Sequence, residues 1–205
     1  MSYTAKNYEY LLGLDGFSDE LLRNHFSLYQ GYVKNTNQLM DQLSDFARKG
    51  TDGGPVFAEL KRRFGWEFNG MRLHEYYFDN MGKNVNHLPD DSAVARKIED
   101  NFNSFAQWAS DFKMTGSIRG IGWTMLCYDN CGDRLLNVWI NEHDVGHLAG
   151  LDVLLVMDVF EHAYMIDYGL KKADYIEAFF KVLNWDAVEK RFQIACSSPI
   201  LGARK

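Results

Sequence analysis

The chain has 205 residues, of which 46% are hydrophobic and 15% aromatic, and its formal net charge is −6. This suits one ordinary domain, or two small halves that share an interface, with a well-buried core. The acidic balance and the lack of a strong basic stripe weigh against nucleic acid as a partner. No apolar run reaches the roughly 20 residues that a membrane span needs, and no secretory signal is visible, so we expect a cytoplasmic protein without a membrane partner.

Three cysteines occur in the chain, Cys127, Cys131 and Cys196. An odd number of cysteines in a chain without an export signal is typical of reduced thiols. Cys127 and Cys131 flank a predicted turn and could form half of a zinc site, but the sequence has no second pair. We therefore favour a core or hairpin role for them.

Two long helices are predicted in the N-terminal part. Ser18 is a suitable N-cap, and a helical stripe of apolar residues continues from it to about Arg48. Pro55 then begins a second helical pattern that extends to Phe78, after a short linker containing glycine. Two long helices joined by a short polar loop predict an antiparallel helical hairpin.

The pattern changes in the second half of the chain. A helical stripe covers residues 94–112, and helical patterns return over residues 164–192. Between them, three short apolar runs are predicted as strands, over residues 122–128, 135–140 and 151–159.

We therefore predict an α+β fold with two parts. Residues 1–88 would form a long α-hairpin domain, and residues 89–205 a C-terminal α/β domain with a small three-stranded antiparallel sheet. The tail from Ser197 onward is expected to fray.

The chemistry points to a cluster of histidines and one aspartate. Asp158 and His162 stand four residues apart in an otherwise apolar stretch, and an aspartate is almost never fully buried unless it is paired or bound to a metal. His25 and His74 lie on the apolar faces of the two long helices and would face each other if these helices pair. Three neutral imidazoles and one carboxylate suit iron or manganese, and also zinc.

Simpler interpretations of the same residues stay open at this point. A single histidine on an apolar helix face is more often a hydrogen-bonded core residue than a ligand, and the Asp158–His162 spacing is common. The combination of two such histidines with an aspartate and its neighbour is what favours a metal site.

These residues also resemble those of a known family. Residues 158–164, Asp-Val-Phe-Glu-His-Ala-Tyr, are similar to the Asp-x-Trp-Glu-His-Ala-Tyr signature of iron/manganese superoxide dismutases. The resemblance continues through residues 173–180 and 182–185, through Gly-Ile-Gly-Trp at 120–123, and through parts of the first two helices. It covers roughly residues 18–192.

The resemblance implies one iron or manganese ion per subunit and assigns roles to nine residues. The implied metal ligands are His25, His74, Asp158 and His162. Tyr32 would stand at the substrate entrance, and His143 is placed where the family has a glutamine or histidine that hydrogen-bonds the metal-bound solvent. Three further residues would surround the ligands, namely Trp123 and Tyr77 in the pocket lining and Glu161 as an acceptor for the partner subunit's His162.

The activity implied by the resemblance is superoxide dismutation. Superoxide would become dioxygen and hydrogen peroxide as the ion is alternately oxidised and reduced, in a homodimer or a homotetramer. Two alternatives stay open, namely another redox or hydrolytic metalloenzyme on the same scaffold and a non-catalytic structural relative. The sequence does not choose between iron and manganese, because both accept this set of ligands.

The chain also departs from the family pattern near the predicted entrance. His25 and Tyr32 are one residue closer together than is usual, so either the helix lacks a one-residue bulge or one of the two residues is misassigned. The other departures are Leu28, Tyr29, Phe160 and Met165, where the family usually has two histidines, a tryptophan and a tyrosine.

Overall fold

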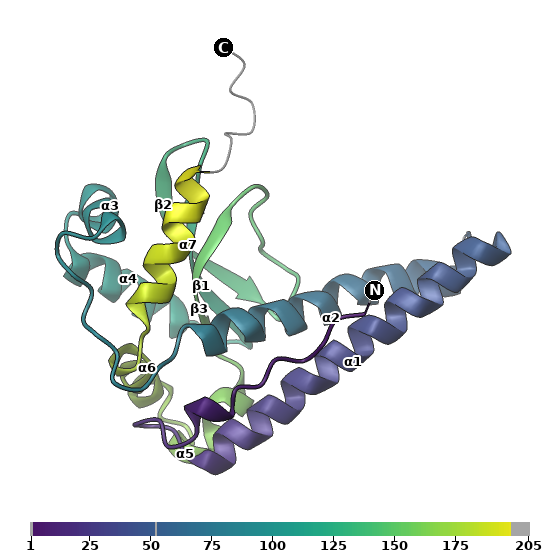
Figure 1. Ribbon diagram of the computed structural model, residues 1–205, viewed down its shortest axis with the longest axis horizontal. Coiled ribbons are helices and arrows are strands. Elements are labelled where there is room, and N and C mark those ends of the chain that lie inside the picture. The colour runs from purple at the N-terminus through teal and green to yellow at the C-terminus, as the bar shows by residue number, and fades with distance from the viewer. Residues whose placement is uncertain (1, 52, 198–205) are drawn as a thin grey trace.

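The computed structural model describes residues 2–51 and 53–197. The tail that was predicted to fray lies outside these residues, apart from Ser197. The N-terminal segment runs along the first long helix (Figure 1) and is tied to it, because the backbone N–H and C=O groups of Tyr3 both bond the side chain of Asn37. A short 3-10 helix, Glu9–Leu11, interrupts this segment.

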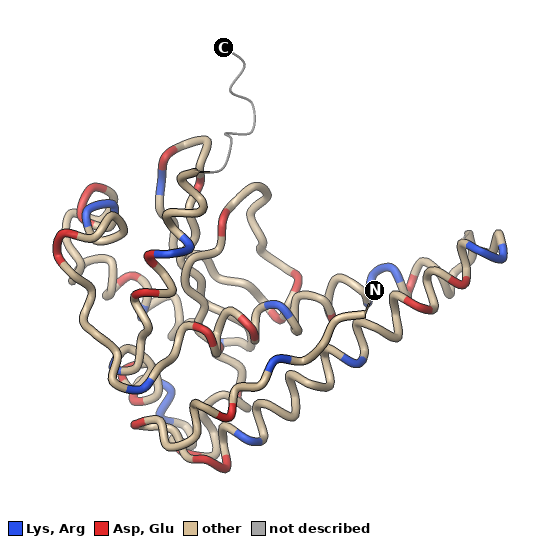
Figure 2. Tube along the Cα trace, in the orientation of Figure 1, with Lys and Arg blue, Asp and Glu red and all other residues tan. Residues whose placement is uncertain are grey.

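Two long helices form the predicted antiparallel hairpin, α1 (Asp19–Lys49) and α2 (Pro55–Asp79) (Figure 1). The hydroxyl oxygen of Ser18 accepts a hydrogen bond from the backbone N–H of Leu21 and so caps α1. Gly50 ends α1 in the left-handed region, with φ 64°, where a residue without Cβ is favoured. Figure 2 shows acidic and basic residues interspersed along both helices.

The next helical stripe is divided into two helices, α3 (Ala93–Phe102) and α4 (Phe105–Gly116). The sequence pattern predicted one uninterrupted helical stripe here, which is wrong because the helix is interrupted between Phe102 and Phe105. Asn103 takes up a left-handed conformation, and the hydroxyl of Ser104 then accepts from the backbone N–H of Gln107 and caps the new helix.

The three predicted strands form one antiparallel sheet in the order β2-β1-β3. Their bounds are Gly122–Asp129 for β1, Arg134–Asn141 for β2 and Asp152–Asp158 for β3. In the central strand, Trp123 pairs with Ile140 on one side and with Asp158 on the other. The register thus places the indole of Trp123 beside the carboxylate that ends β3.

The chain after the sheet is helical, as predicted. A 3-10 helix, Glu161–Ala163, follows β3 and leads into the short helix α5 (Met165–Tyr168). Two longer helices, α6 (Lys172–Lys181) and α7 (Trp185–Ser197), complete the described chain, and α7 packs on β3 (Figure 1).

A single hydrophobic core runs from the helical hairpin into the sheet and its covering helices. This arrangement is the predicted α+β fold, with the helical region first and the three-stranded sheet in the second half. Among the described residues, no helix is long and apolar enough to cross a membrane.

Candidate metal centre

Four side chains from four separate elements meet where the helical hairpin contacts the sheet. His25 comes from α1, His74 from α2, Asp158 from the end of β3 and His162 from the 3-10 helix that follows. The side chains of the first three are fully buried, and that of His162 is 24% exposed. The predicted convergence of these residues is therefore present.

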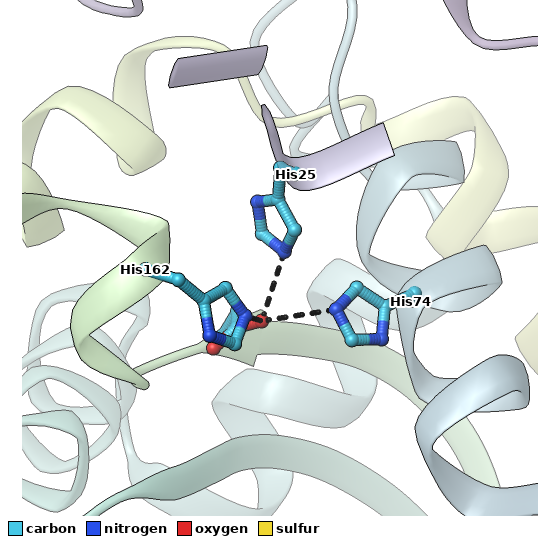
Figure 3. A group of neighbouring side chains, drawn as sticks. His25, His74 and His162 are labelled. Carbon is cyan, nitrogen blue, oxygen red and sulfur yellow. Dashed lines mark hydrogen bonds and ion pairs between the residues drawn. The ribbon is translucent and has the colours of Figure 1, made fainter. Parts of the chain in front are cut away.

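The three imidazoles point toward one carboxylate oxygen (Figure 3). The Nε2 atoms of His25, His162 and His74 lie 3.1, 3.2 and 3.7 Å from Asp158 Oδ2. One donor atom from each of the four residues lies within 4.8 Å of the others. An ion about 2.1 Å from each donor allows two donors to be at most about 4.2 Å apart, so side-chain shifts of a few tenths of an ångström would complete a metal site.

The hydrogen bonds of His74 fit the role of a metal ligand. Its Nδ1–H donates to the backbone carbonyl of Gly70 at 2.5 Å, one helical turn earlier. This bond places the proton on Nδ1 and leaves the lone pair of Nε2 facing the cluster, where Nε2 is buried and has no hydrogen-bond partner among the described residues. Metal-binding histidines are commonly oriented by such a bond from the other ring nitrogen.

Asp158 has one oxygen held in place and one directed at the imidazoles. Its Oδ1 accepts from the backbone N–H of Phe160 at 2.8 Å, which leaves Oδ2 for the cluster. Burial would raise the pKa of Asp158, but the charge and hydrogen bond of His162 and the hydrogen bond of His25 outweigh it, and the pKa lies well below its usual range. The carboxylate is therefore an anion.

For the two buried imidazoles, His25 and His74, the effect of burial prevails and favours the neutral form. Burial lowers the pKa of His25 below its ordinary value and that of His74 well below it, because a charged imidazole loses its hydration there. A neutral imidazole keeps a lone pair for a metal, so His25 and His74 can each offer a nitrogen donor beside the anionic oxygen of Asp158, and His162 adds the third imidazole.

His143 lies beside this cluster in a chain of three hydrogen-bonded side chains. The indole Nε1–H of Trp123 donates to His143 Nδ1 at 3.0 Å, and His143 Nε2 lies 2.9 Å from the hydroxyl oxygen of Tyr32. His143 is fully buried, and burial lowers its pKa to about 4. These bonds bring Tyr32, Trp123 and His143 together beside the cluster.

The direction of this chain of bonds follows from the indole, which can only donate. His143 Nδ1 must accept, so the proton of the neutral imidazole is on Nε2 and is donated to the oxygen of Tyr32. The hydroxyl proton of Tyr32 is then free to be donated to a different acceptor.

Tyr32 stands between the cluster and the outside. Its ring centroid is 5.1 Å from that of His74, and the residue also lines a surface cavity of about 580 Å³ together with Leu28, Arg63 and Trp66. The helix α1 is an uninterrupted α-helix through this region. A spacing of seven residues is close to two α-helical turns, so His25 and Tyr32 share a face without a bulge.

Tyr77 is fully buried and packs beside His25. Its ring centroid lies 5.2 Å from that of His25. Tyr175 donates its hydroxyl proton to the backbone carbonyl of Asp158 at 2.5 Å, and the hydroxyl of Tyr77 lies 3.1 Å from that of Tyr175. These two tyrosines thus fix the backbone at the end of β3.

Glu161 is exposed and takes no part in the buried cluster within one subunit. It is adjacent in sequence to His162, whose partly exposed side chain reaches the surface. The prediction that Glu161 accepts a hydrogen bond from the partner subunit's His162 stays a prediction.

Sequence reasoning missed two residues of α2 that lie against the predicted site. The ring centroid of Trp66 is 4.4 Å from that of His143, and a Cβ atom added to Gly70 would lie 2.6 Å from the ring of Tyr32. Both precede His74 in steps of four residues, and such a row forms one side of a helix. This spacing is the signal that could have identified them.

One further histidine also has a contact that the sequence did not indicate. His147 is exposed, but its Nε2–H donates to the backbone carbonyl of His143 at 2.9 Å. His87 is exposed as well.

Comparison with known proteins gives consistent matches. Residues 90–191 match the family described as "Iron/manganese superoxide dismutases, C-terminal domain". The chain is 35% identical over 187 residues to "Superoxide dismutase [Fe]" of Aquifex aeolicus, covering 89% of this chain and 87% of that protein. It is 36% identical over 177 residues to "Superoxide dismutase [Fe]" of Methanothermobacter thermautotrophicus, covering 85% of each chain. It is 32% identical over 189 residues to "Superoxide dismutase [Mn] 1" of Haloferax volcanii, covering 92% of each chain.

Proposed function

The chain belongs to the iron/manganese superoxide dismutase family, and we propose that it converts two superoxide anions and two protons into dioxygen and hydrogen peroxide. The observation that carries this proposal is the meeting of three imidazoles with one carboxylate, of which His25, His74 and Asp158 are fully buried. Such a set of donors accepts both iron and manganese.

We propose that His25, His74, Asp158 and His162 hold one iron or manganese ion per subunit. The unpartnered Nε2 of His74 supports this, because a buried polar atom without a partner is costly unless something binds it. An ion held by these donors would supply the one-electron redox couple that dismutation requires. One aspartate does not cancel the charge of such an ion, so the site would attract a small anion.

We propose Tyr32 and His143 as the catalytic side chains, which would supply the protons that the reaction consumes. The Nε2–H of His143 donates a hydrogen bond to the hydroxyl oxygen of Tyr32. The hydroxyl proton of Tyr32 can therefore be donated to the substrate or to solvent in the site. Burial raises the pKa of Tyr32, so the hydroxyl keeps its proton at neutral pH.

Trp123 and Tyr77 would keep bulk water away from the ion. Both side chains are fully buried, and their rings lie against His74 and His25 respectively, with centroid distances of 5.0 and 5.2 Å. A dry aromatic wall strengthens the electrostatic attraction between the site and an anionic substrate.

We propose that the working form is a homodimer or homotetramer in which Glu161 accepts a hydrogen bond from the partner subunit's His162. The exposed position of Glu161 supports this interface. The apolar side chains that follow support it as well, since Met165 and Ile166 are 41% and 48% exposed.

We infer that the chain divides into a helical domain, residues 1–88, and an α/β domain, residues 89–205, with the ion between them, because each part provides two of the four donors. We also infer a cytoplasmic location, for which the reduced thiols of Cys127 and Cys196 give support.

The test combines metal analysis with a dismutation assay. The protein purified from its own source should contain about one iron or manganese ion per subunit, and it should accelerate the decay of superoxide in stopped-flow measurements. His162→Ala should lose metal and activity together, whereas His87→Ala, a change at an exposed histidine, should keep both. A wild-type protein that contains the metal but does not accelerate superoxide decay would contradict the proposed function.

A further inference from the structure

His143 is carried by a tight turn at the end of β2. Asn141 and Val145 bracket this turn, and their backbone N–H groups each donate to the other's carbonyl, at 2.8 and 3.3 Å. Inside it, Glu142 has a φ of 51°, in the left-handed region that residues other than glycine rarely adopt. A strained conformation of this kind persists only where its surroundings enforce it.

The side chain of Glu142 shows what enforces this conformation. One of its carboxylate oxygens accepts the indole N–H of Trp66 at 3.1 Å, and its backbone N–H donates to the carbonyl of Ile121 at 2.9 Å. Trp66 belongs to α2 and is 76 residues away in sequence. The hydrogen bond to a charged carboxylate therefore fixes the turn to the helical hairpin.

The ring of Trp66 also contacts the imidazole that the turn presents. Its centroid is 4.4 Å from that of His143, with an angle of 74° between the ring planes. The guanidinium group of Arg63 lies over the indole at 3.8 Å, and Arg63 is held in turn by the buried carboxylate of Glu67 at 2.6 Å. Trp66 is thus fixed between a cation and an imidazole.

We propose that Trp66 and Glu142 are positioning residues for His143. The Trp66–Glu142 bond sets the turn, and the indole ring limits the rotation of the imidazole. Together they direct Nδ1 toward Trp123 and Nε2 toward Tyr32. The catalytic consequence rests on the proposed dismutase function, whereas the positioning itself is a property of the folded chain.

The first test measures position without using activity. In metal-free protein labelled with ¹⁵N-histidine, NMR should show His143 with an acceptor Nδ1 and a protonated Nε2. Trp66→Phe keeps an aromatic ring but removes the N–H, and Glu142→Gly removes the carboxylate while relieving the strained φ. Both variants should shift the ¹⁵N signals of His143, whereas Glu142→Gln, which keeps an acceptor oxygen, should preserve them. Trp139→Phe on β2 serves as the matched control and should leave them unchanged.

The second test measures the catalytic consequence in the metal-loaded enzyme. Trp66→Phe and Glu142→Gly should keep full metal content and lower kcat by about three- to tenfold, while Glu142→Gln restores most of it. Unchanged His143 signals in both Trp66→Phe and Glu142→Gly would overturn the positioning role. If the His143 signals shift in these variants but the metal-loaded wild type shows no dismutation, the proposed function is overturned and the positioning role is still supported.

Discussion

Asp158 is the residue around which the buried cluster is organised. Its Oδ1 is occupied by a backbone N–H, while its Oδ2 faces three imidazoles, so the carboxylate cannot be replaced by a group that lacks two acceptor oxygens. The sequence indicated that Asp158 has partners, because an aspartate in an apolar run is almost never buried without one. Its partners were predicted from sequence patterns, but their distances were not.

The hydroxyl group of Tyr32 is predicted to affect turnover but not metal binding. Tyr32→Phe should retain the metal, since no ligand changes, but should lower turnover roughly tenfold, because a positioned proton donor is lost and water replaces it only in part. Tyr10→Phe, at a tyrosine that is 57% exposed, is the control. Stopped-flow kinetics over a range of superoxide concentrations checks this, and identical kinetics for Tyr32→Phe and wild type would rule out the role.

The buried imidazole of His143 predicts a pH dependence for the metal-free protein. Its pKa is about 4 in the folded chain and about 6.5 in the unfolded chain, so the unfolded chain binds a proton first as the pH falls. The stabilisation is therefore complete above pH ~6.5 and is lost as the pH falls toward ~4. Urea unfolding of wild type and His143→Gln at pH 7 and pH 5 measures the effect.

The expected difference in this comparison is about 2 kcal/mol. Wild type should lose that much more unfolding free energy than His143→Gln between the two pH values. The contributions of His25 and His74 are present in both proteins and cancel. Equal losses would show that His143 is not buried as a neutral imidazole.

The helical hairpin and the sheet could be predicted because each has a clear local pattern. Ser18 and Pro55 begin α1 and α2 as their chemistry dictates. The break between α3 and α4 was missed, because an apolar stripe continues across Asn103 and nothing local forces the left-handed turn there. The contact of Trp66 with His143 depends on how α2 packs against the turn that follows β2, and the helical spacing of Trp66 and His74 does not give that packing.

Gly70 gives a prediction about how α1 and α2 pack. A Cβ at this position would lie 2.6 Å from the ring of Tyr32, so Gly70→Ala must displace that ring. Dismutation should fall, while the better helix propensity of alanine, worth up to about 1 kcal/mol, offsets part of the steric cost. The change in stability should therefore be small compared with the change in activity.

The same helix provides a matched control in Gly65, where an added Cβ would meet nothing within 4 Å. Gly65→Ala should raise the unfolding free energy by about 0.5–1 kcal/mol and leave the activity unchanged. If Gly70→Ala is as active as Gly65→Ala, dismutation does not depend on the observed position of the Tyr32 ring.

For the whole molecule, the proposed ion joins elements from both halves of the chain. Metal that binds only the folded state stabilises it by about 4 kcal/mol at a concentration 1,000 times its dissociation constant. Metal removal should therefore lower the midpoint of thermal unfolding by about 10 °C. Calorimetry with and without Mn²⁺ checks this, and His162→Ala should show no such dependence; a midpoint that is the same in both conditions would contradict a shared ion.

The central claim is that His25, His74, Asp158 and His162 bind one redox ion, and anomalous X-ray scattering from crystals of the purified protein tests it most directly. Data collected on both sides of the iron and manganese absorption edges should show one peak per subunit, about 2.0–2.2 Å from the three Nε2 atoms and from Asp158 Oδ2. A peak located elsewhere, or no peak in protein that is active in dismutation, would contradict the claim.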